Sequence, residues 1–118
     1  MENKKYNLII RTEEYCKKIL SLAKKVPRNS VTFPLISQFV RSGTSVGANY
    51  CEADNAESKS DFRHKICICK KESKETIFWM RMLLEVCPDL SLEIKNLEQE
   101  STELNLIFNA IIKSCDQK

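Results

Sequence analysis

Apolar side chains recur at alternating steps of three and four residues along four segments of the chain. This spacing places them on one face of an α-helix. The pattern breaks at Pro27, at the polar residues 54–58 and at Pro88, because proline and short polar residues interrupt helices. We expect helices at about residues 7–26, 33–53, 59–87 and 90–115. Short connections between amphipathic helices predict an all-α fold: an antiparallel up-down-up-down four-helix bundle, one domain over residues 1–118.

Each predicted helix has an apolar face that we assign to the core. In the first helix this face carries Leu8, Thr12, Tyr15, Ile19, Leu22 and Val26; in the second it carries Ile36, Val40, Gly43, Gly47 and Tyr50. In the third it carries Phe62, Ile66, Cys69, Ser73, Thr76, Met80, Leu83 and Cys87; in the fourth it carries Leu90, Ile94, Leu97, Ser101, Leu104, Phe108, Ile111 and Cys115. Helix starts prefer small hydroxyl side chains, so Thr32 or Ser30 is expected to cap the second helix, and Ser58 or Ser60 the third.

The amino-acid composition supports a helical fold but does not show what the protein binds. Two glycines and three prolines in 118 residues are too few turn residues for an all-β protein. The balance of 19 Lys+Arg against 16 Asp+Glu does not by itself indicate nucleic-acid binding. No segment is long and apolar enough to span a membrane, and residues 1–6 lack the apolar core of a signal peptide. We therefore expect a cytoplasmic protein without a membrane partner.

The cysteines and the histidine are the candidates for chemistry. The six cysteines lack Cys-x-x-Cys spacing, so we expect free thiols, no metal and no cofactor. His64 and Cys67 are three residues apart on one predicted helix, but such a pair usually lacks the third group that would orient the base. The chain has no Glu-x-x-His motif for a di-iron centre and no glycine-rich phosphate loop. We therefore predict no catalytic residues and no enzymatic activity.

The third helix carries a row of positive charges beside its core face. Five basic residues fall within an arc of roughly 60° at ~100° per residue and extend over about 33 Å. We call them the basic stripe: Lys59, Arg63, Lys70, Lys74 and Arg81. A solvated face whose cations pair with acids on neighbouring helices is one interpretation. A phosphate-binding track for RNA is the other, because clustered cations release counterions from nucleic acid.

The same helix carries more large apolar side chains than one bundle core can cover. These side chains, together with an acid set among them, define the aromatic patch: Ile68, Glu75, Phe78, Trp79 and Met82. Exposed surface rich in Trp, Phe and Met is typical of protein–protein interfaces. Burial on two sides within a monomer is the alternative. We favour self-association, with Glu75 paired to a basic group across the contact, because a helix in a four-helix bundle has one inner face.

The second helix has an unusual polar side. Opposite its predicted apolar face we place a polar strip that contains Arg41, Ser42, Ser45, Asn49 and Glu52, with Gln38 preceding it. Serine and asparagine are weaker helix formers than the Glu, Lys and Gln of an ordinary solvated helix. Short polar side chains suit close contact with a subunit or ligand, and the strip is expected either to line a channel or to face a partner.

These residues resemble those of a known family. The segment RSGTSVGANYCEA at residues 41–53 is similar to a signature of bacterial four-helix bundle proteins related to the ribosomal RNA intervening-sequence protein. Residues 58–62 (SKSDF) and 71–79 (KESKETIFW) resemble the third-helix signature of one branch. The resemblance is specific from about residue 33 to residue 84. Cys51 stands where that branch often has a basic residue, and Ala53 replaces the commoner glycine.

The resemblance implies an antiparallel four-helix bundle that assembles as a ring, typically a homopentamer, without enzymatic activity. It also implies a relation to the accessory variability proteins of diversity-generating retroelements, which bind a reverse transcriptase and nucleic acid through basic surfaces. The leading hypothesis is therefore an oligomeric binding protein that presents the basic stripe to RNA or to a nucleic-acid-processing protein. A purely structural homo-oligomer with no nucleic-acid role is the alternative.

Overall fold

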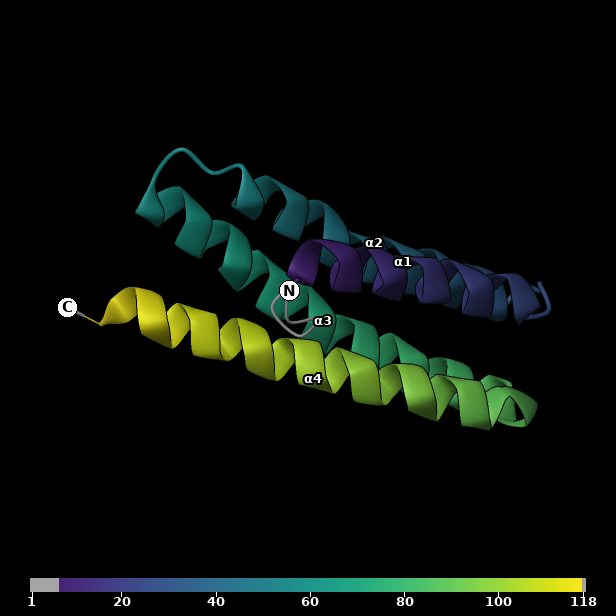
Figure 1. Cartoon of the computed structure of the whole chain (residues 1–118). Helices are drawn as coiled ribbons and strands as arrows, with labels where there is room; N and C mark the ends of the chain where they lie inside the picture. Colours follow the sequence, from purple (N-terminus) through teal and green to yellow (C-terminus); the bar gives the residue numbers. More distant parts are fainter. Residues whose placement is uncertain (1–6, 118) are drawn as a thin grey trace.

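Four helices pack side by side, and each runs opposite to the one before it (Figure 1). The computed structural model describes residues 7–117. The helices are α1 (Leu8–Lys25), α2 (Thr32–Asp54), α3 (Lys59–Val86) and α4 (Ser91–Asp116), with a short 3₁₀ turn, η2 (Pro88–Leu90), before α4. α3 packs against both α2 and α4, while α1 packs against α2 and, over a smaller area, α4. The predicted all-α, up-down-up-down four-helix bundle is confirmed.

The helix ends follow local chemistry at most positions. α1 ends two residues before Pro27, and the Ser58 hydroxyl caps α3 by accepting a hydrogen bond from the Asp61 amide at 3.0 Å. The predicted cap of α2 is wrong. The Asn29 carboxamide oxygen accepts from the amides of Val31 and Thr32, both at 2.9 Å. Thr32 is the first residue of the helix, and its hydroxyl accepts from the Asn29 amide at 3.0 Å and donates to the Pro27 carbonyl at 2.6 Å.

The predicted core faces of the first and third helices are confirmed, although Phe62, near the start of α3, is only partly buried. The fourth is confirmed in its central part, although Ile112 is buried where Ile111 was expected. The predicted face of α2 needs a correction. α2 also buries Phe39, Ser42, Val46 and Ala53. It does so because α2 lies between α1 and α3 and therefore has two covered sides.

α1 and α2 approach closely at two glycines. A Cβ atom at Gly43 would lie 2.8 Å from three carbon atoms of the Ile19 side chain, and a Cβ at Gly47 would lie 2.5 Å from Cys16 Sγ. Heavy atoms at these separations overlap, so any side chain at either position must displace its neighbour. The two glycines thus set the distance at which α1 packs on α2.

A buried polar layer crosses the middle of the bundle. The Tyr15 hydroxyl on α1 is 2.7 Å from Ser101 Oγ on α4, and Ser101 donates to the Ser73 carbonyl of α3 at 2.8 Å. Nearby, the hydroxyls of Thr76 on α3 and Ser42 on α2 are 2.9 Å apart. Burial raises the pKa of Tyr15 to about 12. The layer links all four helices in one register, because a hydroxyl shifted from its partner would remain buried and unsatisfied.

Replacing Ser101 with alanine is expected to lower the free energy of unfolding by about 1–2 kcal/mol, because it leaves the Tyr15 hydroxyl buried without its partner. Urea denaturation followed by circular dichroism measures this. A Tyr15→Phe/Ser101→Ala double variant should cost less than the sum of the single variants, because neither partner is then left unpaired. Strict additivity would show that the two hydroxyls do not interact.

Candidate nucleic-acid and assembly surfaces on α3

α3 positions the candidate residues because it lies between α2 and α4. One face of this helix, including Ile66, Met80 and Leu83, is buried in the core. On the side toward α4 the helix carries the basic stripe, and on the side toward α2 it carries the aromatic patch. The two surfaces therefore share one rigid element of 28 residues.

Both arginines of the basic stripe are held by acids of α4. Arg63 binds Asp116 through two nitrogens, at 2.6 and 2.9 Å, and Arg81 binds Glu98 at 3.3 Å. The hydrogen bonds with Asp116 raise the pKa of Arg63, and those from Arg63 lower the pKa of the Asp116 carboxyl. For these two arginines, the structure therefore agrees with the first interpretation of the stripe, in which its cations pair with acids on a neighbouring helix.

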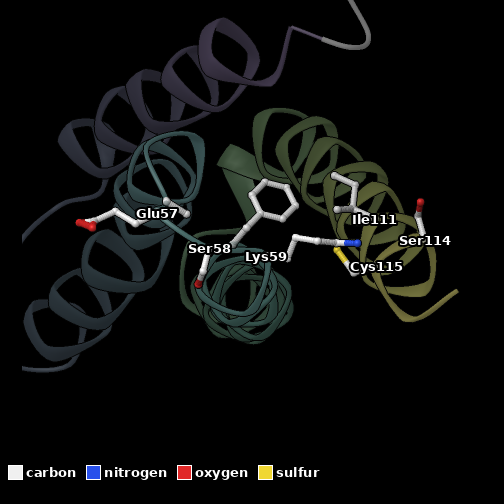
Figure 2. A pocket seen from close by; sticks show the side chains of 8 residues that line it. Glu57, Ser58, Lys59, Ile111, Ser114 and Cys115 are labelled. Atoms are coloured by element: carbon white, nitrogen blue, oxygen red, sulfur yellow. The ribbon is translucent and has the colours of Figure 1, made fainter. Parts of the chain in front are cut away.

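The three lysines of the stripe differ from the arginines. Lys59, Lys70 and Lys74 are exposed, and none of them forms an ion pair with any residue in the range 7–117. Figure 2 shows the Lys59 side chain extending from the start of α3 toward Ile111 and Cys115 of α4, with Glu57 pointing away. The Lys59 side chain therefore lies toward α4.

A groove between α3 and α4 gathers further positive charge. Its walls are formed by four basic residues and three others: Arg63, Lys70, Lys71, Lys74, Cys67, Asn105 and Ile112. The Asn105 amide nitrogen donates to the Lys70 carbonyl at 2.8 Å and to Ser73 Oγ at 3.0 Å, which fixes α4 against α3. Such a concentration of like charge on one groove attracts anions. We call this the α3–α4 groove.

The aromatic patch is covered in part by its own chain. Trp79 is half-buried and packs against the core cluster, while Phe78 is 51% exposed. The two rings meet edge to face, with their centroids 4.9 Å apart. Ile68 and Met82 are half-buried. The patch thus retains exposed apolar surface, centred on Phe78.

The acid in the patch already has partners within the chain. Glu75 accepts hydrogen bonds from the Trp79 indole, at 2.9 Å, and from Arg41 of α2. The indole hydrogen bond and the guanidinium hold the pKa of Glu75 below its usual value. Arg41 also lies 3.4 Å from Glu72, a largely buried acid. The basic group that we expected across a subunit contact is therefore supplied by α2 of the same chain.

The polar strip of α2 is partly internal. Ser42 is 0% exposed and faces Thr76, so it does not belong to an outward strip as predicted. Glu52 pairs with Lys65 of α3 at 2.7 Å. Asn49 turns its amide back to the Ser45 carbonyl at 2.9 Å. Because Arg41 of the strip pairs with Glu75 of the aromatic patch, the two surfaces meet on one α2–α3 face, which periodicity within single helices does not reveal.

Several residues of these surfaces were missed in the sequence. Lys65 has no motif that marks it, whereas Lys71 and Glu72 lie in the third-helix signature at residues 71–79 but were given no role. Lys71 lies three residues before Lys74, and Glu72 three residues before Glu75, so both are within reach of predicted residues on a helix. The Glu52–Lys65 pair depends on the packing of α2 on α3 and leaves no local signal.

Two further properties hold for residues 7–117. Within this range, no helix has the length and apolar character required to cross a membrane. The same residues contain no group of three or more His, Cys, Asp or Glu side chains placed to hold a metal ion.

Comparison with known proteins places this architecture in a family. The model of the 23S rRNA-intervening sequence protein family matches residues 4–110. The chain belongs to this family. No curated protein matches it significantly. A crystal structure of a Bacteroides thetaiotaomicron protein of unknown function from the S23 ribosomal protein family is similar, with 33% sequence identity and a TM-score of 0.81. That match covers 89% of this chain and 97% of the other.

Proposed function

We propose that this protein is a non-enzymatic, oligomeric binding protein that presents the basic stripe of α3 to RNA. The family to which it belongs is described as a 23S rRNA-intervening sequence protein family, which supports an RNA-related role. The proposed assembly uses the α2–α3 face, so that the basic stripe on the other side of α3 remains accessible.

The three unpaired lysines carry this proposal. An ion pair satisfies a cation within the protein, whereas Lys59, Lys70 and Lys74 form none with the described residues. Lysines clustered on one side of a helix gain free energy from the counterions that a polyphosphate releases. Copies of the stripe in an oligomer would add avidity without any new type of contact.

A purely structural oligomer is the second candidate. The pairing of Arg63 with Asp116 and of Arg81 with Glu98 favours it, because these arginines hold α3 and α4 together. In this case the stripe contributes to folding, and the remaining lysines serve solubility.

Charge reversal at the stripe should separate the two functions. We expect Lys70→Glu/Lys74→Glu to weaken binding to a labelled RNA at least tenfold at low salt, because two attractive contacts become repulsive. Fluorescence anisotropy measures the dissociation constant, and size-exclusion chromatography checks the assembly.

The matched control is Lys18→Glu/Lys24→Glu on α1. These lysines are also exposed and without ion pairs among residues 7–117, so net charge changes equally on a helix away from the stripe. The control should bind RNA within a fewfold of the wild-type protein. If the wild-type protein shows no affinity for RNA at low salt, the proposal is wrong and the structural alternative stands.

A further inference from the structure

Resting on the proposed function, we infer that the RNA bound by α3 is double-stranded and is held through its phosphates. The proposed function does not specify the form of the RNA, because cations alone would bind the phosphates of single-stranded and duplex RNA alike. The geometry of the stripe and the placement of the exposed rings distinguish the two.

The unpaired lysines form a straight, rigid row. α3 is continuous from Lys59 to Val86, so Lys59, Lys70 and Lys74 keep fixed separations over about 22 Å at ~1.5 Å per residue. The α3–α4 hydrogen bonds of Asn105 and Arg63 stiffen this side of the bundle. A duplex presents its phosphates to such a row in fixed positions, whereas a flexible single strand must lose conformational freedom to match it.

The rings that could stack on bases lie elsewhere. Proteins that bind single strands combine a basic groove with aromatic side chains on which successive bases stack. Within residues 7–117, the exposed aromatic rings are those of Phe33, His64 and Phe78. Phe33 lies in the first turn of α2. His64 lies about 110° around α3 from the mean direction of the row at ~100° per residue. Phe78 lies about 70° from that direction and one turn after Lys74, but its ring packs edge to face on Trp79, in the α2–α3 face that the proposed assembly covers. Bases laid along the row would therefore find cations but no stacking surface.

The groove beside the row also lacks a free amide for reading bases. The amide nitrogen of Asn105 already donates hydrogen bonds to the Lys70 carbonyl and to Ser73 Oγ. Lysine ammonium groups are point charges that contact phosphates without reading sequence. Duplex RNA is recognised mainly by its shape and through phosphate and 2′-hydroxyl contacts. The row and the groove together offer this type of contact.

The test compares a labelled RNA duplex of about 16 base pairs, the length spanned by known duplex-RNA-binding domains, with each of its isolated, unstructured strands. Fluorescence anisotropy with the full-length protein gives each affinity between 50 and 200 mM salt. We expect the duplex to bind at least tenfold more tightly than either strand. In Lys70→Gln/Lys74→Gln, the slope of log affinity against log salt should fall by about half, because two of the four unpaired lysines of the row and the groove are lost.

The outcomes separate this inference from the function on which it rests. A single strand that binds as tightly as the duplex, or more tightly, overturns the inference and leaves RNA binding in place. An unchanged salt slope in the double variant also overturns it, because the row would then not hold the phosphates. Absence of binding to all three RNAs at 50 mM salt overturns both the inference and the proposed function.

Discussion

Replacing Gly43 with leucine is expected to lower the free energy of unfolding by about 3 kcal/mol or more. Even the first side-chain carbon would lie 2.8 Å from Cδ1, Cγ1 and Cγ2 of Ile19. Ile19 is fully buried and cannot rotate into open space. Overpacking a core typically costs about 1–3 kcal/mol, and leucine adds three further carbons to a site without room for one. The better helix propensity of leucine offsets roughly 1 kcal/mol.

Urea denaturation followed by circular dichroism gives this free energy. Ala48→Leu is the matched control, because Ala48 is exposed on the same helix and leucine there meets solvent. The control should change the free energy of unfolding by less than about 0.5 kcal/mol. A Gly43→Leu protein with a wild-type denaturation midpoint would show that α1 does not pack against α2 at this position.

The helices could be predicted from the sequence because their limits are set locally. Pro27 and Pro88 lie in the breaks because proline is excluded from a helix interior, and Ser58 caps α3 through an amide only three residues away. The α2 cap illustrates the limit of such reasoning. Thr32 has a suitable side chain, but the helix begins at Thr32 itself, and the Asn29 side chain accepts from the Thr32 amide instead. Two residues with similar capping preferences are distinguished only by the folded connection.

The sequence predicts which residues share one side of a helix, but it does not predict the contacts that these residues make with another helix. Helical spacing places the five basic residues on one side of α3, and the structure agrees. Spacing could not show that Arg63 and Arg81 bind acids of α4, because those contacts depend on the relative register of two helices. The same reason explains Ser42. Its side of α2 is polar and looks solvent-facing, but α3 covers it and Thr76 supplies a partner.

Replacing Trp79 with glutamate is expected to convert the proposed oligomer into smaller species, down to monomers. The indole contacts the core cluster on one side and Phe78 on the other, so a charge there would face the apolar surface that we assign to the subunit contact. It would also stand one helical turn from Glu75, which would lose its indole donor and gain a like charge. Light scattering coupled to size-exclusion chromatography gives the mass of the particle.

Because Trp79 also packs against the core, a second variant, Phe78→Glu, is needed to separate an effect on assembly from an effect on folding. Phe78 is half exposed, so its replacement removes interface surface with little effect on the monomer. Leu92→Glu on α4 is the control: Leu92 is 73% exposed, lies outside the α2–α3 face and should leave the mass unchanged. The proposed contact requires the apolar surface that the four helices leave open at Phe78. If Trp79→Glu and Phe78→Glu both fold and keep the wild-type mass, self-association through this face is refuted. If that mass is also the mass of a monomer, the α3 stripe would have to bind RNA as a single copy, without avidity.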